Sequence, residues 1–418
     1  MQPPRLPGWS AKLASHNAQV YSGAAMAIAQ PLIKSASVPP ERSSKARLIS
    51  LDIYRGLVVA GMILVDNPGS DEGAYWPIKH AKWNGWTPAD LIFPSFLFLV
   101  GVSIVFAFSS RLKRGESRGQ ILYHAFKRSL LLIAIGLFVN GFPFVDFDPH
   151  TYRIEGVTQR IALCYLMATI LELWSSRRGQ AIALAACLLG YWAILRFVPV
   201  PGFGLPGRDI PFMDPERNLV AWLDRTLFAG RLYNGVRDPE GIISTIPALG
   251  TTLMGVLTGH WLRSQHSHTT KIARMLFFGV LGLIAGLLWN QWFPINKNLW
   301  TSSFVLFTSG FALVTLSLLY WMTEVKGWRG AWMTPFLVFG MNAIVAYIAD
   351  ALVYGPGYSF KAHAPNGAVV NWHEAAQAHL EAAGFSVANA SLIYSIAAVG
   401  FCWFLLWVLW RKKIFLKI

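Results

Sequence analysis

Apolar runs of about 20 residues recur along nearly the whole chain, and they constrain its fold more than any other feature. Of its 418 residues, 54% are hydrophobic and 14% are charged, whereas about a quarter of the residues of a soluble globular chain carry charge. A segment in lipid has to satisfy its backbone hydrogen bonds internally, so each run is expected to be a helix. The sequence therefore predicts an all-α polytopic integral membrane protein.

About ten membrane-spanning helices are predicted, at residues 50–66, 90–109, 121–141, 157–174, 180–198, 243–262, 273–293, 302–322, 333–353 and 390–410. An even number of spans places both termini on one side of the membrane. Lys and Arg residues gather between alternate spans and at both ends, at 42–47, 111–118, 177–178, 263–274, 326–329 and 411–417. By the positive-inside rule these six segments, and hence both termini, are expected to be cytoplasmic.

The formal net charge of +15 does not indicate a nucleic-acid partner, because the basic residues lie in short clusters between apolar runs and form no basic domain. The basic clusters are therefore topology signals and not a binding surface, and the expected partner of the apolar runs is the lipid bilayer. Cys164, Cys187 and Cys402 all lie inside apolar runs, which favours neither a disulfide framework nor a thiolate metal cluster. No zinc-ligand spacing or phosphate-binding glycine loop is present, so we expect no metal.

Two parts of the chain differ in character. Residues 1–46 carry several Pro and Ser residues without apolar periodicity, and we expect a disordered cytoplasmic tail with no cleaved signal peptide. Residues 47–418 are expected to form one transmembrane domain. Its predicted outer loops are 67–89, 142–156, 199–242, 294–301 and 354–389.

The first outer loop holds His80, which lies close in sequence to Asp66 and Asp90. Histidine is the side chain best suited to act as a base near neutral pH. His80 is therefore either a base or an interfacial histidine in a Trp-rich loop. Thr87, Pro88 and Asp90 match the first positions of a helix, so Asp90 is expected to cap that helix, to orient His80, or to do both.

Further charged residues lie at the predicted membrane boundaries. Asp52 and Arg55 are three residues apart on one helix face, where a local ion pair is the default expectation. Arg160 either extends toward the interface or faces an anion inside the bundle. Asp238 and Glu240 either cap the start of the sixth span or bind a polar ligand.

Several strings, read together, resemble one family, the transmembrane acyltransferases typified by heparan-alpha-glucosaminide N-acetyltransferase in their compact bacterial form. The resemblance covers about residues 47–418. The strings are LDIYRG at 51–56, HAKWNGWTPADLIFP at 80–94, RIEGVTQRIA at 153–162, and the segments 238–247 and 294–303.

This resemblance implies transfer of an acetyl group from cytosolic acetyl-CoA to the amine of a glucosamine-type sugar across the membrane. The family's active histidine maps onto His80, and its asparagine maps onto either Asp66 or Asn67. By the same resemblance we expect a multi-pass protein of a bacterial inner membrane, with the amino sugar on the periplasmic side. A homodimer is expected by family analogy.

Amine attack on a thioester requires a base, a donor for the oxyanion and a site shielded from water. We expect His80 to be the base or a transient acetyl acceptor, Asp66 or Asp90 to orient its ring, and Asn67 or a backbone amide to meet the oxyanion. Cofactor-binding candidates for the CoA phosphates are Arg55, Arg160 and Lys297. Substrate-binding candidates are Asp238, Glu240, Trp83 and Asn296.

Two alternatives remain open at this stage. A bundle of about ten spans with intramembrane charges and Pro-interrupted helices is also typical of an N-acetylglucosamine transporter, although the sequence shows no internal repeat. A non-enzymatic membrane scaffold could use the long outer loops 199–242 and 354–389 as partner surfaces.

Overall fold

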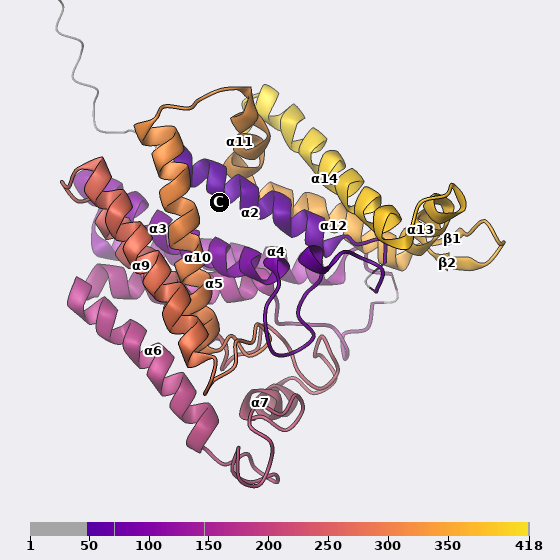
Figure 1. Cartoon of the computed structure of the whole chain (residues 1–418), viewed down its shortest axis with the longest axis horizontal. Coiled ribbons are helices and arrows are strands. Elements are labelled where there is room, and N and C mark those ends of the chain that lie inside the picture. The colour runs from indigo at the N-terminus through magenta and orange to yellow at the C-terminus, as the bar shows by residue number, and fades with distance from the viewer. Residues whose placement is uncertain (1–47, 71, 146, 417–418) are drawn as a thin grey trace, which may run out of the picture. The chain divides into compact units, whose positions relative to one another are not determined.

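The computed structural model describes residues 48–70, 72–145 and 147–416, and it is mostly helical (Figure 1). The expected tail at 1–46 lies outside the described residues. The long helices are α2 (Ile49–Asp66), α3 (Ile92–Lys113), α4 (Arg118–Gly141), α5 (Val157–Trp174), α6 (Arg177–Phe197), α8 (Thr245–Leu262), α9 (His268–Trp289), α10 (Ser302–Tyr320), α12 (Ala343–Ser359) and α14 (Val387–Arg411). Shorter ones are α7 (Leu219–Leu227), α11 (Thr334–Met341) and α13 (Trp372–Ala382). Every predicted span therefore coincides with helix.

Fewer helices than predicted meet a strict test for crossing a membrane. Within the described residues, six helices are long and apolar enough to span, or seven if the bent pair α11–α12 counts as one span. The helices α2, α5 and α8 are not among them. Ten spans, and the cytoplasmic placement of both termini, stay predictions.

The three helices that fall short of this test are largely enclosed, as are α3 and α10, which pass it. In α8, 13 of 18 residues are buried, whereas α9 buries only three of its 22. A helix surrounded by protein can carry polar side chains, because other helices and not lipid supply its surroundings. The polar residues that keep α2, α5 and α8 from meeting the test therefore face the interior of the bundle.

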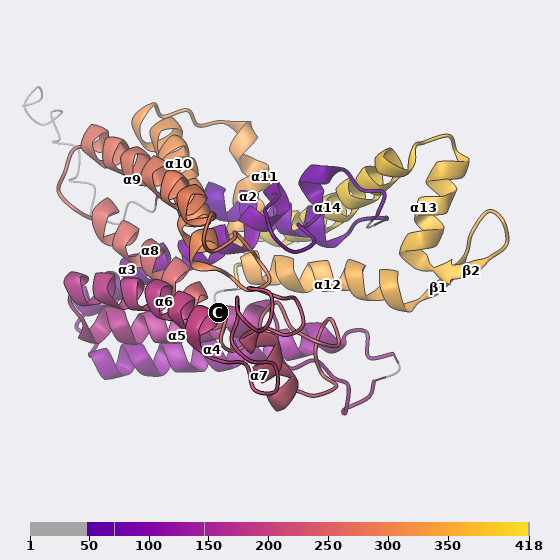
Figure 2. The same cartoon turned by 60° about the horizontal axis from the view of Figure 1, so that its bottom comes forward.

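Glycines bring three pairs of helices into backbone contact. A Cβ atom on Gly101 of α3 would lie 1.9 Å from the carbonyl oxygen of Thr252 in α8, which no larger residue could tolerate. Such contacts let helices approach closely where there is no hydrophobic drive between them in lipid. Close backbone packing at glycines also joins α2 to α11, at Gly56 and Gly340, and α9 to α10, at Gly279 and Gly310. Both views show α9 and α10 side by side (Figure 1, Figure 2).

The ninth predicted span, 333–353, is wrong as a single straight helix. It is the pair α11 and α12, bent by 83°, and α12 continues to Ser359. Asn342 at the bend has non-helical backbone angles, and its buried side chain is bonded elsewhere. Its Nδ2 donates to the carbonyl of Ile414, and its Oδ1 accepts from the N–H of Leu416, both at 3.2 Å. The backbone of Ile414 and Leu416 therefore supplies the hydrogen-bond partners of the Asn342 side chain at the bend.

Three of the predicted outer loops contain regular structure, and in the first it is the short 3₁₀ helix Trp76–Ile78. The segment after α12 forms an antiparallel hairpin of β1 (Lys361–His363) and β2 (Val369–Asn371), followed by α13. In Figure 2 this hairpin and α13 extend beyond the end of α12. The hairpin is the one exception, in the part of the chain described, to the all-α expectation. The loop 199–242 likewise contains α7.

Candidate functional site

His80 is held by the carboxylate that begins α3. Its Nδ1 lies 2.8 Å from Asp90 Oδ1, and the other oxygen, Oδ2, accepts the backbone N–H groups of Ala81 at 3.1 Å and Thr87 at 3.0 Å. Pro88 starts the short 3₁₀ turn Pro88–Leu91 that leads into α3. Asp90 therefore caps a helix with one oxygen and contacts the imidazole with the other, which are the two expectations placed on it.

Lys297 joins this pair from the hairpin between α9 and α10. Its Nζ lies 3.1 Å from both ring nitrogens of His80 and 3.7 Å from Asp90 Oδ1. The Asp90 side chain is completely buried, while 43% of the His80 side chain is exposed. An accessible imidazole, held at Nδ1 by a buried carboxylate and approached by an ammonium group, has the composition of a general-base site.

Asp66 and Asn67, the two candidates for the family's asparagine, point to different surroundings. The amide of Asn67 is buried and donates to Asp350 Oδ1 at 2.6 Å and to the Ile63 carbonyl at 2.9 Å. Asp66 instead interacts electrostatically with His80 and Lys297. The structure thus brings Asp66, and not the amide of Asn67, into the surroundings of His80.

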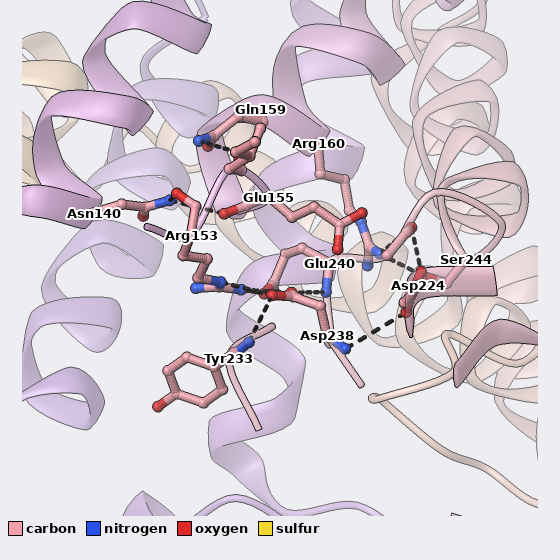
Figure 3. Close-up of polar contacts among 12 residues, drawn as sticks. Asn140, Arg153, Glu155, Gln159, Arg160, Asp224, Tyr233, Asp238, Glu240 and Ser244 are labelled. Atoms are coloured by element: carbon pink, nitrogen blue, oxygen red, sulfur yellow. Dashed lines mark hydrogen bonds and ion pairs between the residues drawn. The ribbon is translucent and has the colours of Figure 1, made fainter. Parts of the chain in front are cut away.

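A second charged group forms around Arg153 (Figure 3). The Arg153 guanidinium binds both oxygens of Asp238, at 2.7 and 2.6 Å, and also Glu240 Oε2 at 2.5 Å. Asp238 accepts the N–H of Tyr233 as well, at 3.2 Å. The substrate candidates Asp238 and Glu240 are therefore engaged by an arginine from the preceding outer loop. Glu240 also interacts electrostatically with Asp66, which links this group to His80.

Arg160 lies in the interior and does not extend to the interface. It is 1% exposed, and its Nη2 donates to the carbonyl of Gly241 at 3.1 Å and to the Ser244 hydroxyl. Its guanidinium also stacks on the Trp300 ring at 5.1 Å. In Figure 3, Glu155 extends toward the Arg160 head group from the turn before α5.

The carboxylates of this second group differ in their pKa values. Burial, reinforced by Asp224 and Asp238, raises the pKa of Glu155 to about 8. Burial likewise raises the pKa of Asp224 to about 7, with a further contribution from Asp238. Burial also acts to raise the pKa of Asp238, but the hydrogen bonds from Arg153 outweigh it and hold that pKa below its ordinary value.

Three other predicted residues lie apart from His80 or are engaged in holding loops. Arg55 forms the expected ion pair with Asp52, Nη1 to Oδ1 at 3.2 Å, and donates to Ser103 at 2.9 Å. Trp83 donates its Nε1–H to the Met213 carbonyl at 2.9 Å, which ties the first outer loop to the third. Asn296 accepts from the N–H of Leu299 at 2.9 Å and so shapes the hairpin that carries Lys297.

Sequence reasoning assigned no role to Arg153, Glu155 or Asp224. A charged pair two residues apart at a predicted span boundary was a signal for the first two, because charges there need partners. Asp224 had no comparable signal. It lies in α7, within a predicted outer loop, and its carboxylate becomes notable only because the chain folds it against Gly241.

Comparisons with known proteins identify the family of the chain. The family described as Heparan-alpha-glucosaminide N-acetyltransferase, catalytic, matches residues 47–290, which include His80, Asp90, Arg153 and Asp238. The heparan-alpha-glucosaminide N-acetyltransferases of Mus musculus and Homo sapiens are each 32% identical to the chain, over 93% and 89% of its length. These alignments cover 63% and 60% of the two relatives, so the chain spans about three fifths of their length. The chain belongs to the heparan-alpha-glucosaminide N-acetyltransferase family.

Proposed function

We propose that this chain is a transmembrane acetyltransferase. It would move an acetyl group from cytosolic acetyl-CoA to the amine of a glucosamine-type sugar on the outer side of a bacterial inner membrane. The observation that carries the proposal is the contact of His80 with Asp90, both within the segment that matches the family, and with Lys297, seven residues beyond that segment. The names of the two relatives, which specify N-acetyltransferases of glucosaminide, support the substrate class.

The chemistry assigned to His80 is proton transfer. The neutral amine attacks the thioester carbonyl, and His80 Nε2 takes the proton that the nitrogen loses. Asp90 accepts from Nδ1–H, which fixes the tautomer that carries its lone pair on Nε2, the nitrogen that Lys297 Nζ also approaches at 3.1 Å. As the carbon–sulfur bond breaks, the imidazolium returns its proton to the CoA thiolate. We favour this direct transfer over an acetyl-His80 intermediate because the CoA thiolate is a good leaving group.

The oxyanion of the tetrahedral intermediate needs a donor near the same imidazole. Asn67 is bonded to Asp350, whereas the Lys297 ammonium lies beside the ring. We therefore propose that Lys297 stabilises the oxyanion and that Arg55 binds the CoA phosphates. Asp66, which interacts with both His80 and Lys297, is assigned to the amine of the acceptor.

Arg55 lies at a suitable separation for that role. It is eleven residues before Asp66 along α2, or about 16 Å at 1.5 Å per residue. An extended pantetheine arm is of comparable length, so CoA phosphates near Arg55 would allow the thioester to reach His80. The basic end of α2 also lies on the side predicted to be cytoplasmic.

Purified protein carrying His80→Ala tests the proposal. Acetyl transfer from labelled acetyl-CoA to glucosamine should fall at least about 100-fold, because a positioned base contributes about 100- to 10,000-fold. His150→Ala, at an exposed histidine of another outer loop, is the matched control and should retain activity. Transfer by His80→Ala near the wild-type rate would exclude His80 as the base. Trapping of labelled acetyl on wild-type protein without acceptor would establish the covalent route instead.

One observation favours the transporter alternative. The α11–α12 break of 83° resembles the discontinuous helices of secondary carriers. Counterflow of labelled N-acetylglucosamine in proteoliposomes without acetyl-CoA separates the two functions. Saturable uptake there would identify a carrier, and its absence alongside acetyl transfer would identify the enzyme.

A further inference from the structure

Three nearly or fully buried side chains near Arg153 have polar atoms without partners. Within the described residues, neither carboxylate oxygen of Glu155, which is 7% exposed, accepts a hydrogen bond. Oδ1 of Asp224 also lacks a partner, as do Nε and Nη1 of Arg160. Buried polar groups without partners are costly, so native proteins pair nearly all of them, often with a ligand or water. Five such atoms in one place therefore indicate a site that binds something.

The neighbouring ion pairs do not supply these partners. Arg153 is already committed to Asp238 and Glu240 through three contacts of 2.5–2.7 Å. Arg160 interacts with Glu155 and Asp224 electrostatically, without a hydrogen bond to either. The loop meets Asp224 through its backbone: the N–H of Asp238 lies 3.5 Å from Oδ2, and a Cβ atom on Gly241 would lie 2.5 Å from the same oxygen, while Oδ1 stays without a partner.

The free atoms define the chemistry of a ligand. A phosphate would use the Arg160 donors but would leave the oxygens of Glu155 and Asp224 without hydrogen-bond donors, and a bare ammonium would use those oxygens but meet the guanidinium. A hydroxyl group donates one hydrogen bond and accepts two. Adjacent hydroxyls of one molecule can therefore donate to Glu155 and Asp224 while they accept from Arg160.

This set of side chains borders the surroundings of His80. Glu240, which is bonded to Arg153, interacts electrostatically with Asp66, and Asp66 interacts with His80. The charges around Arg160 are therefore continuous with those around the base.

We propose that Glu155, Arg160 and Asp224 form the subsite for the ring hydroxyls of the acceptor. This inference rests on the proposed acetyl transfer, because that reaction is what places the amine of the acceptor at His80. It assigns Arg160 to the sugar and not to a CoA phosphate, because the unpartnered oxygens of Glu155 and Asp224 beside it need donors that a phosphate does not supply.

Kinetics of Glu155→Gln test the subsite. The variant keeps the size of the side chain but removes one strong acceptor, so KM for glucosamine should rise about tenfold or more, while KM for acetyl-CoA stays unchanged. Asp209→Asn, a carboxylate of the same outer side that is paired with Arg208, is the matched control. An unchanged KM for glucosamine in Glu155→Gln, or an equal rise in both KM values, would overturn the assignment.

Ligand binding without acetyl-CoA keeps this test independent of catalysis. Thermal unfolding of purified protein is followed with glucosamine, glucose, ethanolamine or inorganic phosphate. Both sugars should raise the Tm of the wild type, ethanolamine and phosphate should not, and Glu155→Gln should lose at least half of the sugar-induced shift. Absence of protection by either sugar would leave water as the occupant and overturn the proposal, as would protection by phosphate. If the sugars protect but no acetyl transfer occurs, the subsite stands and the proposed function fails.

Discussion

The two oxygens of Asp90 act on different parts of the molecule: Oδ1 lies 2.8 Å from His80 Nδ1, and Oδ2 accepts the backbone N–H groups of Thr87 and Ala81. One residue therefore shapes the start of a membrane helix and the orientation of the proposed base. Replacing the carboxylate with an amide separates these effects, because an amide oxygen can still cap the helix but an amide nitrogen cannot accept from Nδ1–H.

Asp90→Asn should lower kcat for acetyl transfer about 100-fold, since the imidazole loses the acceptor that fixes its tautomer. The Tm should change little if the amide oxygen retains the cap. Steady-state rates and thermal unfolding are measured on the same preparation. A variant that loses stability but keeps its rate would show that Asp90 serves only as a cap.

Lys297→Met distinguishes two roles for this ammonium group. If it stabilises the oxyanion beside His80, kcat should fall about 10- to 100-fold with KM for acetyl-CoA nearly constant. If it binds a CoA phosphate, KM should rise instead. Lys82→Met, at an exposed lysine two residues after His80, is the control and should behave as wild type.

Arg153→Met should lower the free energy of unfolding by about 2–4 kcal/mol, because it leaves the buried Asp238 carboxylate without its cation. Arg153→Lys should cost less, since it keeps the charge but loses the two-pronged contact. Arg208→Met, which removes an exposed partner of Asp209, should cost less than either substitution of Arg153. Equal losses in Arg153→Met and Arg208→Met, measured by thermal unfolding in detergent, would contradict this ranking.

The pH dependence of stability should differ between wild type and Glu155→Gln. The folded protein holds a proton on Glu155 up to a pKa of about 8, whereas the unfolded chain releases it near the ordinary glutamate value. Stability contributed at low pH is therefore lost as the pH rises toward 8, by up to about 1.4 kcal/mol per pH unit. Glu155→Gln should gain stability relative to wild type across this range. Parallel profiles of Tm against pH would show that Glu155 titrates normally.

Gly101→Ala should strongly destabilise the protein, because its Cβ atom would collide with the Thr252 carbonyl and force α3 away from α8. Gly190→Ala in α6 is the matched control, since a Cβ atom there has no described neighbour within 4 Å. The control should be neutral or slightly stabilising, as expected for removal of a helical glycine. Yield of monodisperse protein and Tm report both outcomes.

The helices could be predicted from sequence because each apolar run satisfies its backbone locally, so length and hydropathy carry the signal. The bend at Asn342 could not. No proline marks it, and its side chain is bonded to Ile414 and Leu416, more than 70 residues away. The number of spans was harder to predict. Polar residues in α2, α5 and α8 argue against a span that faces lipid, but they are compatible with a span in the interior of a bundle.

The same distinction applies to the site. His80 and Asp90 are ten residues apart, so a contact between them could be expected from the loop alone. Arg153 and Asp238 are 85 residues apart, and nothing local indicates that the two would meet. The amide of Asn67 was a reasonable oxyanion donor until its bond to Asp350 was seen. Long-range pairing is what sequence reasoning missed.

The glycine contacts have a mechanical consequence. Helices whose backbones touch, with no side chains between them, cannot slide or part without breaking that contact, so α3–α8 and α9–α10 each behave as one stiff unit. His80 precedes the first of these units, and Lys297 lies on the hairpin within the second. Any motion that admits a sugar or releases CoA must therefore take place between the units, and the spacing of 3.1 Å between these two side chains is where such a motion would register first.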